Sequence, residues 1–406
     1  MKKILHINTS TSKGGAAKIA RTIHKKINSK MKFKSYFVFG RGNDSNCENS
    51  MKFTLQPEIY LHGLITRFLG IEGYGNYFST LRLINFIEKR DFDIIHLHNL
   101  HGYYLNIFQF INYLKRKKLS AIWTFHDGWP ITGSCAYIKE CKKWENGCRQ
   151  CMNKKWYPQN YINNSEIMWK KKRKVFSNGW DPIIVTPSKW LAQNVKKSFL
   201  KNHRVKIINN GINTEIFKKY DKNDIFEEYN IPKNKKTILF IASDLNNEKK
   251  GAKYFFDSLK YIDKKYNILI VGNKLKKYNV KSNIYQLGYI YDQEKLAKLY
   301  SASNIYCITS LDENFPTTVL ESLSCGTPVV GFDVGGISEQ VNDACGFVVP
   351  SKNEKELAKK IEILIKNDNL RNKMSDNCRK KALKKYSIKR MLKSYIKLYD
   401  SIKQRG

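Results

Sequence analysis

The stretch 305–332, which reads IYCITSLDENFPTTVLESLSCGTPVVGF, decides the fold. It opens on a short apolar run at 305–308 and closes on a second one at 328–332. Between them lie a polar loop and a helical pattern. Pro316 suits the first turn of that helix, because its ring fixes a helical φ and its missing N–H costs nothing there. A strand, a helix and a second strand in this order predict a βαβ unit within a parallel sheet.

The same alternation of apolar runs and amphipathic segments extends over almost the whole chain. In the second half, the expected strands lie at 237–242, 267–271, 284–287, 305–308 and 328–332. In the first half, they lie at 4–8, 35–39, 94–98, 121–125 and 183–186, and 205–208 is also strand-like. Two such sets predict an α/β protein with two doubly wound, Rossmann-like domains.

The domain boundary is expected at Asn209, where a strand-like run ends and a polar segment follows. This gives a first domain at 1–208, a second at 209–378 and a C-terminal segment at 379–406. The last segment has the pattern of a basic amphipathic helix, whose apolar stripe needs a partner surface. We expect core packing, with membrane contact as the alternative. Residues 129–161 break the alternation and are interpreted as an insertion.

The charge of the chain is strongly positive. Its 406 residues include 73 Lys and Arg against 35 Asp and Glu, a formal net charge of +38. Such a charge favours polyanionic surroundings. The basic residues are dispersed, which argues against a nucleic-acid-binding protein, because those gather basic and aromatic residues on one face. Two explanations stay open: lysines that cover a solvated surface, and affinity for an anionic membrane.

The sequence carries no recognisable membrane or export signal. Its N-terminus lacks the apolar run of a signal peptide, and no stretch reaches the roughly 18 apolar residues of a membrane span. We therefore expect a cytoplasmic protein, soluble or peripherally attached to a membrane. In that compartment most of the nine cysteines should be reduced.

Loops that follow strands are the candidate sites, because open α/β sheets bind ligands at the carboxyl ends of their strands. Gly14 and Gly15 follow the first strand and open a helix. Such a pair lets backbone amides approach a phosphate, although a plain tight turn explains it equally well. His126 ends a later strand, where it could bind a sugar or a phosphate or move a proton. A structural histidine is the alternative.

Three histidines, His96, His98 and His101, fall within six residues and raise the question of a metal site. His96 and His98 share one face of a strand that should be buried, and no nearby carboxylate completes a ligand set. We interpret them as polar packing.

The insertion contains Cys135, Cys141, Cys148 and Cys151, spaced C-x5-C-x6-C-x2-C. Four thiolates could hold one structural zinc ion in a tetrahedral site, and the C-x2-C half is a common zinc knuckle. The alternative is a set of unligated or redox-sensitive thiols, since the compartment disfavours disulfides. A catalytic metal is not expected.

Two loops of the second half carry further candidates. A lysine at a helix start, such as Lys249 or Lys250, can neutralise a diphosphate. Glu313 precedes the helix of the opening stretch and Glu321 lies on it, where carboxylates make charge-assisted hydrogen bonds to hydroxyl groups. The free amides at the start of this helix, around 316–319, suit a phosphate or a sugar oxygen.

Motifs in both halves resemble those of the retaining glycosyltransferases of family 4. The most specific match lies at 313–339, ENFPTTVLE followed by SLSCGTPVVGFDVGGISE, and NNGINTEIF at 209–217 is also similar. In the first half, HLHNLHGYYLN at 96–106, TFHDGWPITGSC at 124–135 and the C-x2-C segment resemble the colanic-acid and other exopolysaccharide transferases of that family. The resemblance covers nearly the whole chain.

This resemblance implies the GT-B fold, in which two Rossmann-like domains face a cleft and the C-terminal helix crosses back to the first domain. It implies an acceptor side in the first domain and a nucleotide-sugar donor in the second. The reaction would be a retaining hexosyl transfer without a catalytic metal. The acceptor would be a polyprenyl-diphosphate-linked saccharide or a growing polysaccharide of the bacterial surface, at the inner face of the cytoplasmic membrane.

The resemblance also implies roles for the candidate residues. Glu321 would hold the donor ribose, Glu313 and His126 would contact the donor sugar at the catalytic centre, and Lys250 would neutralise the diphosphate. The implied donor-binding residues are Gly14, Gly15, Lys249, Lys250, Glu313, Asn314, Phe315, Pro316, Thr317, Thr318 and Glu321. Many relatives carry an arginine shortly before the phosphate-binding lysine, and this chain does not, so we expect Lys249 to compensate.

Two other functions stay open. A nucleotide-sugar epimerase can use the same fold, but it would need acid and base groups around the donor sugar, and no clear set beyond the two glutamates is apparent. A basic nucleic-acid-binding protein is disfavoured by the dispersed charge.

Overall fold

The computed structural model divides the chain into two compact units. Unit 1 comprises residues 1–208 and 392–406, and unit 2 comprises residues 209–391. The structure describes residues 1–12, 14–29, 32–43, 47–138, 141–151, 158–221, 223–273 and 283–403. Residues 139–140 and 152–157 of the cysteine-rich insertion therefore lie outside the described residues.

Unit 1 is built on a sheet of seven parallel strands in the order β3-β2-β1-β4-β5-β6-β7. The strands are β1 (Lys2–Asn8), β2 (Phe33–Phe39), β3 (Ser50–Lys52), β4 (Ile94–Leu97), β5 (Ala121–Thr124), β6 (Ile183–Thr186) and β7 (Val205–Ile207). Every residue of β4, β5 and β6 is buried. Continuous apolar runs of this kind are typical of parallel strands covered on both faces.

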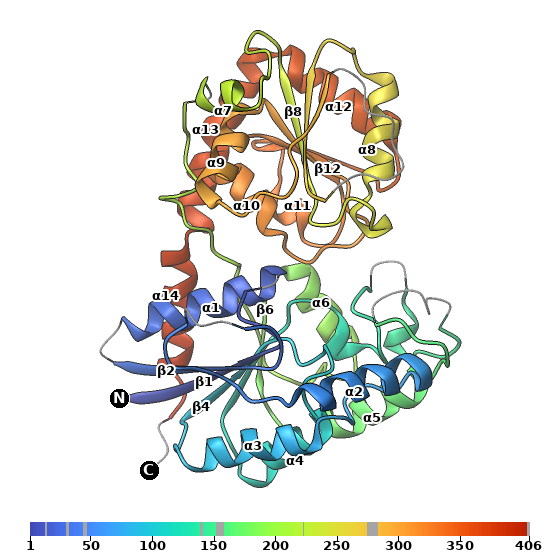
Figure 1. The fold of residues 1–406 in the computed structure, drawn as a ribbon, viewed down its shortest axis with the longest axis vertical. Helices are drawn as coiled ribbons and strands as arrows, with labels where there is room; N and C mark the ends of the chain where they lie inside the picture. Colours follow the sequence, from blue (N-terminus) through green and yellow to red (C-terminus); the bar gives the residue numbers. More distant parts are fainter. Residues whose placement is uncertain are drawn as a thin grey trace. The chain divides into compact units, whose positions relative to one another are not determined.

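Helices cover both faces of the unit 1 sheet, with α1 on one side and α3 and α4 on the other (Figure 1). The helices are α1 (Gly14–Asn28), α2 (Gln56–Leu69), α3 (Tyr77–Glu88), α4 (Ile107–Arg116), α5 (Ser165–Ser177) and α6 (Lys189–Lys197), with short 3₁₀ turns η1 (Trp129–Ile131) and η2 (Lys143–Glu145). Side chains cap α4 and α6 at their starts. The side chain of Asn106 accepts a hydrogen bond from the amide of Gln109 and caps α4.

The last helix, α14 (Ile388–Asp400), packs its apolar stripe into unit 1 from residue 392 onward. Tyr395 and Tyr399 are buried there. The Tyr399 hydroxyl bonds to Nδ1 of His96 at 2.7 Å, and the Lys2 ammonium donates to the Tyr399 carbonyl at 3.0 Å. The start and the end of the chain are thus joined within one unit. The predicted return of the C-terminal helix to the first domain is confirmed, but it begins at residue 392 and not at 379, because residues 379–391 belong to unit 2.

Unit 2 is built on six parallel strands in the order β10-β9-β8-β11-β12-β13. The strands are β8 (Thr237–Ile241), β9 (Asn267–Val271), β10 (Ile284–Gln286), β11 (Ile305–Ile308), β12 (Val329–Phe332) and β13 (Gly346–Val349). The helices and turns are α7 (Asn223–Glu228), η3 (Glu248–Lys250), α8 (Ala252–Ser258), η4 (Leu259–Tyr261), α9 (Gln293–Ala302), α10 (Thr317–Ser324), α11 (Ile337–Gln340), α12 (Glu354–Lys366) and α13 (Asp368–Lys385). In Figure 1, α9 and α10 lie on one side of the sheet and α8 and α12 on the other.

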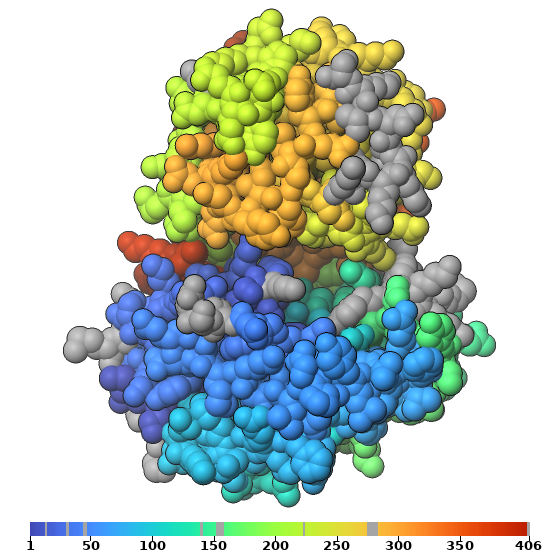
Figure 2. Space-filling model, viewed as in Figure 1, coloured from blue at the N-terminus to red at the C-terminus, as the bar shows by residue number. Residues whose placement is uncertain are grey.

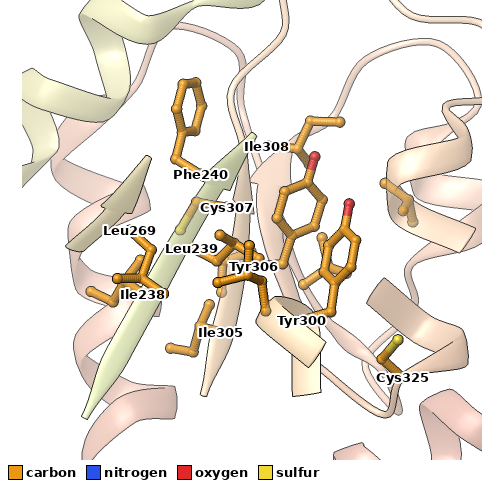
Figure 3. Packing of buried hydrophobic residues seen from close by; sticks show 14 of the residues in the cluster. Ile238, Leu239, Phe240, Leu269, Tyr300, Ile305, Tyr306, Cys307, Ile308 and Cys325 are labelled. Carbon is orange, nitrogen blue, oxygen red and sulfur yellow. The ribbon is translucent and has the colours of Figure 1, made fainter. Parts of the chain in front are cut away.

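The core of unit 2 lies between its sheet and these helices. Phe240 of β8 stacks on Phe255 of α8, with ring centroids 4.5 Å apart. On the other side, Tyr300 of α9 meets Tyr306 of β11 edge to face at 5.4 Å. Figure 3 shows both tyrosines among the strand residues, with their hydroxyl groups pointing the same way. These two rings lie beneath the start of α10, the helix that the sequence singles out.

The prediction of two doubly wound parallel α/β domains is confirmed. All ten strands expected from the alternation are present, and 205–208 becomes β7. Sequence reasoning missed β3 and β13, which are short edge strands, and β13 begins at a glycine with only three apolar residues after it. Among the described residues, no helix combines the length and the apolar character that a membrane crossing requires.

Candidate functional site

The loop between β11 and α10 contains the residues that the sequence marks most strongly. Pro316 has φ −63° and ψ 130° and occupies the N-cap of α10, one position before the helix, and not its first turn. A proline side chain has no acceptor, so this cap leaves the first-turn amides to other partners. Thr317 and Thr318 begin the helix and are partly exposed. A helix start of this kind attracts anions, because its amides and its dipole point outward.

Lys250 and Glu313 form an ion pair at this edge of the sheet. The Lys250 Nζ lies 2.7 Å from Glu313 Oε1, and the side chains are 32% and 17% exposed. Lys250 ends η3, which follows β8, and Glu313 follows β11, the neighbouring strand. A second bond joins the two loops, because the Lys249 carbonyl accepts a hydrogen bond from the Leu311 amide at 2.8 Å. The structure therefore brings together two predicted residues that are distant in the sequence.

Glu321 lies on α10 with only 5% of its surface exposed. Its Oε2 accepts a hydrogen bond from the Tyr300 hydroxyl at 3.1 Å. Burial, and then the nearby carboxylate, raise the pKa of Tyr300 well above its ordinary value, so the phenol stays protonated and keeps donating. A buried carboxylate needs such a partner, since an unpaired one is costly to desolvate. Sequence reasoning missed Tyr300, because on α9 it looks like one more core aromatic.

The turn at Gly335 and Gly336 packs against the loop that contains Glu313 and holds it in place. Gly335 has φ +59°, and a Cβ at this position would lie 1.5 Å from the Glu313 carbonyl oxygen, so only glycine fits. The Gly336 amide donates to the Asn314 carbonyl at 2.9 Å. The Gln340 side chain donates to the Pro316 carbonyl at 3.0 Å. Sequence reasoning missed Gln340. The glycine pair and Gln340 together brace residues 313–316.

Phe315, between Asn314 and Pro316, is buried and fixes the same loop from within. Its ring meets Tyr386 at 5.7 Å, and its carbonyl accepts a hydrogen bond from the Asn210 side chain at 3.3 Å. The candidates from Glu313 to Thr318 therefore form one braced loop and helix start, and Lys250 of η3 reaches it through Glu313.

Gly14, Gly15 and His126 belong to unit 1. Gly14 opens α1 with φ +85°, and a Cβ placed on either glycine meets no atom within 4 Å. The helix start is thus exposed and open, as a phosphate-binding turn requires, although a tight turn has the same features.

His126 is the end of a chain of hydrogen-bonded imidazoles. Its Nε2 lies 3.1 Å from Nδ1 of His98, whose Nε2 lies 3.2 Å from Nδ1 of His6. The residues come from the carboxyl ends of β5, β4 and β1. Burial lowers the pKa of His126 to about 4, so the ring is neutral at physiological pH. A neutral imidazole has one donor nitrogen and one acceptor nitrogen. Whether Nε2 of His126 donates or accepts is therefore coupled to the role of Nδ1 of His98, its partner.

The nearby histidines can be explained without a metal. Ring nitrogens of His6, His96 and His98 lie within 4.8 Å of one another. However, both nitrogens of His96 are engaged, one with the Tyr399 hydroxyl and one with Thr124 Oγ1 at 2.8 Å. Both nitrogens of His98 are engaged with other histidines. The interpretation of His96 and His98 as polar packing stays a prediction.

The loop that follows His126 is held by buried charges that sequence reasoning missed. The Trp129 indole donates to Glu72 at 2.7 Å, and the Lys172 ammonium donates to the Trp129 carbonyl at 2.9 Å. Both charged residues are 1% exposed. Asp127 accepts from the Trp129 amide at 2.9 Å and pairs with His101 at 2.9 Å. Nothing in the spacing of these residues reveals the network, because they come from separate elements.

The four cysteines of the insertion surround one small cavity of about 30 Å³ in unit 1. Cys135 and Cys141 precede η2 in the sequence, and Cys148 and Cys151 follow it. All four are partly buried thiols.

Comparison with known proteins identifies relatives along the whole chain. Residues 14–216 match the model of Glycosyltransferase Family 4, and residues 221–381 match that of Glycosyl transferases group 1. WcaC of Escherichia coli K12, assigned to colanic acid biosynthesis as a glycosyl transferase, is 24% identical over 98% of this chain and 100% of its own length. The N,N'-diacetylbacillosaminyl-diphospho-undecaprenol alpha-1,3-N-acetylgalactosaminyltransferase of Campylobacter jejuni is 29% identical over 52% of this chain and 58% of its own.

Solved structures with the same architecture include sucrose-phosphate synthase from Thermosynechococcus elongatus, with a TM-score of 0.73, 16% identity and 98% coverage of both chains. Anabaena HepE in complex with UDP-glucose has a TM-score of 0.70, 15% identity, and coverage of 99% of this chain and 100% of its own. At such identities the likeness concerns the fold alone, and it confirms the predicted GT-B architecture.

The histidine network predicts that unit 1 loses stability in mild acid. Burial lowers the pKa of His6, His96 and His98 as well as that of His126. The unfolded chain takes up protons near pH 6.5 on these residues and the folded unit does not, so the free energy of unfolding falls as the pH drops below 6.5. For each such histidine, the free energy of unfolding falls by up to about 1.4 kcal/mol per pH unit. His101 opposes this, because its raised pKa stabilises the fold at low pH.

All seven tryptophans lie within residues 1–208, so tryptophan fluorescence during urea unfolding reports on unit 1. We expect the free energy of unfolding to decrease between pH 7 and pH 5.5, and His98→Asn to flatten this dependence. Stability that stays constant or rises over this range would contradict the account.

Proposed function

The chain belongs to glycosyltransferase family 4, and from this premise we propose that it transfers a hexose from a nucleotide-sugar donor, with retention, to a lipid-linked or growing saccharide in the synthesis of a bacterial surface polysaccharide. The names of its relatives support this assignment. WcaC is assigned to colanic acid biosynthesis, and the Campylobacter enzyme is named for an acceptor built on diphospho-undecaprenol. HepE has been solved with UDP-glucose, which supports a nucleotide-sugar donor.

The observation that carries the proposal is the Lys250–Glu313 pair beside the open start of α10. A diphosphate brings negative charge that a lysine and helix amides can bind together. In the donor complex, the Lys250 ammonium turns to the diphosphate and neutralises the leaving group as the glycosidic bond breaks. Glu313 then accepts hydrogen bonds from hydroxyl groups of the donor sugar.

Glu321 serves the other end of the donor. Its carboxylate is oriented by the Tyr300 hydroxyl at Oε2, and it accepts hydrogen bonds from the two ribose hydroxyl groups. The two glutamates therefore divide the donor between them, one at the sugar and one at the ribose. His126, Gly14 and Gly15 of unit 1 complete the site in this proposal, with His126 as a neutral hydrogen-bonding group toward the sugar.

We further place the enzyme at the cytoplasmic face of an anionic membrane, where a lipid-linked acceptor resides. An apolar face of unit 1 supports this location. On α2 and the start of α3, large apolar side chains stand in solvent: Tyr60, Leu61, Leu64, Phe68, Tyr77 and Phe78 are each more than half exposed. The two helix segments are joined because Glu58 of α2 accepts hydrogen bonds from the amides of Phe78 and Ser79.

The apolar face continues onto Tyr161, whose ring lies 5.6 Å from that of Phe68 and 5.9 Å from the Arg67 guanidinium. In Figure 2, the blue segment that contains α2 lies at the surface of unit 1. Aromatic rings beside arginines suit the interface of an anionic bilayer, and the net charge of +38 adds attraction to it.

Glu321→Ala should abolish most of the transfer and leave the fold intact. The loss of hydrogen bonds from ribose hydroxyls to a carboxylate costs about 3 kcal/mol, roughly 100-fold in kcat/KM. The assay is nucleoside-diphosphate release over a panel of donors with an acceptor-lipid extract. Glu227→Gln, an exposed glutamate of unit 2, is the matched control and should leave turnover unchanged. Near-normal turnover of Glu321→Ala would refute the donor assignment.

Membrane attachment is tested with the double variant Tyr60→Ser and Phe78→Ser. We expect the wild type to co-sediment with vesicles that contain anionic phospholipid, and the variant to lose most of this binding because it buries less apolar surface. Tyr291→Ser, which changes an 86% exposed tyrosine of unit 2, is the control. If the double variant sediments with vesicles as the wild type does, this face is not the attachment surface.

A further inference from the structure

The insertion between η1 and α5 has little regular structure to hold it. Among its described residues, only η2 forms a helical turn. Two apolar anchors, Ile138 and Trp144, are buried in unit 1 at 4% and 3% exposure. A segment with so few apolar contacts and so little backbone pairing commonly depends on a covalent or metal cross-link.

The four cysteines are placed where such a cross-link belongs. All four line one cavity, two of them before η2 in the sequence and two after it. The cavity is small, about 30 Å³, and Thr132, Ser134 and Ser165 are also among the residues that line it. Four sulfurs around a single ion are the ligand set of structural zinc sites. Among the described residues, the one set of three mutually close ligand atoms is that of His6, His96 and His98, so an ion bound by the four cysteines would draw their sulfurs closer together.

Two of the sulfurs already accept hydrogen bonds from backbone amides. The Gly133 amide donates to Sγ of Cys148 at 3.1 Å, and the Tyr137 amide donates to Sγ of Cys135 at 3.3 Å. A thiol is a weak acceptor, whereas a metal-bound thiolate is a strong one, and amides directed at sulfur are the usual second layer of such sites. These bonds fix the orientation of one sulfur from the first two cysteines and one sulfur from the last two.

The C-x2-C turn holds an unusual backbone conformation. Cys148 has φ 54° and Gln150 has φ 48°, a region that residues other than glycine rarely adopt. The turn is closed by Lys143, whose carbonyl accepts from the Cys148 amide at 2.8 Å and whose ammonium donates to the Gln150 carbonyl at 2.9 Å. Such strain persists where the surrounding structure compensates for it, and it often marks a ligand clamp.

The charges around the cavity favour an anionic centre. Zinc with four thiolates carries a net charge of −2. Lys143 lines the cavity with an exposed side chain, and the side chain of Lys172 is close enough to Cys148 and Cys135 to interact with them electrostatically. Positive charge on these lysines would offset part of the charge that a zinc–thiolate centre introduces.

We propose that Cys135, Cys141, Cys148 and Cys151 bind one structural zinc ion that anchors the insertion to unit 1. The ion holds the segment that follows His126 and Trp129, and it takes no part in bond making. The site is separate from the donor loop of unit 2 and does not depend on the proposed transferase reaction.

The test is the metal content of the full-length protein, purified without chelators and measured by elemental analysis. We expect about one zinc per chain in the wild type and less than about 0.1 in Cys148→Ala and in Cys151→Ala. Cys345→Ala, a buried cysteine of unit 2, should keep the metal. Tryptophan fluorescence of each variant shows whether unit 1 is still folded.

A second measurement keeps the proposal testable if the variants fail to fold. Wild-type protein treated with a mercurial reagent should release one equivalent of zinc to a chromogenic dye, and four additional thiols should become reactive. Absence of zinc from the wild type, a different metal in its place, or a disulfide among the four cysteines in freshly purified protein would overturn the proposal.

Discussion

Parallel pairing of β8 with β11 is the constraint on which the site depends. It brings the carboxyl ends of two strands to one edge of the sheet, so the loops that follow them meet and Lys250 reaches Glu313 at 2.7 Å. The cation of one loop and the carboxylate of the other then lie beside the open start of α10. Everything else in unit 2 supports that arrangement. The Gly336 amide and the Gln340 side chain donate hydrogen bonds to carbonyls of the Glu313 loop. Tyr300 orients the carboxylate of Glu321 on the helix that follows.

Unit 1 also brings polar side chains together from neighbouring parallel strands, but these side chains are histidines. The ends of β1, β4 and β5 place His6, His98 and His126 in a hydrogen-bonded series, and burial keeps those imidazoles neutral. The loop after His126 is then held by Glu72, Trp129 and Lys172, and the cysteine cluster lies beyond it. Unit 1 thus holds a neutral imidazole at the end of this series, and its helix α2 presents an apolar face to solvent.

The sequence predicts the strands, the two-domain architecture and most of the residues in the loops, because apolar periodicity and the position of a residue after a strand are local properties. It does not predict the contacts. The pairing of Lys250 with Glu313 depends on strand order, which no local pattern encodes. Tyr300 looks like a core aromatic, and Glu72 and Lys172 look like ordinary surface charges until the fold buries them together. Pro316 lies at the N-cap, one position before the predicted first turn, because proline suits both places in a helix. The bond from the Gly336 amide to the Asn314 carbonyl joins two different loops, and no local pattern reveals it.

The central claim is that the Lys250 loop binds the diphosphate of the donor and Glu313 does not. Calorimetric titration of the full chain with nucleoside diphosphates, beginning with UDP, tests it directly. Lys250→Met should weaken the binding of the preferred diphosphate about 10-fold or more, the value of one charge-assisted contact, whereas Glu313→Gln should not weaken it, because loss of the carboxylate frees Lys250 for the diphosphate. Equal affinity of Lys250→Met and wild type would contradict it.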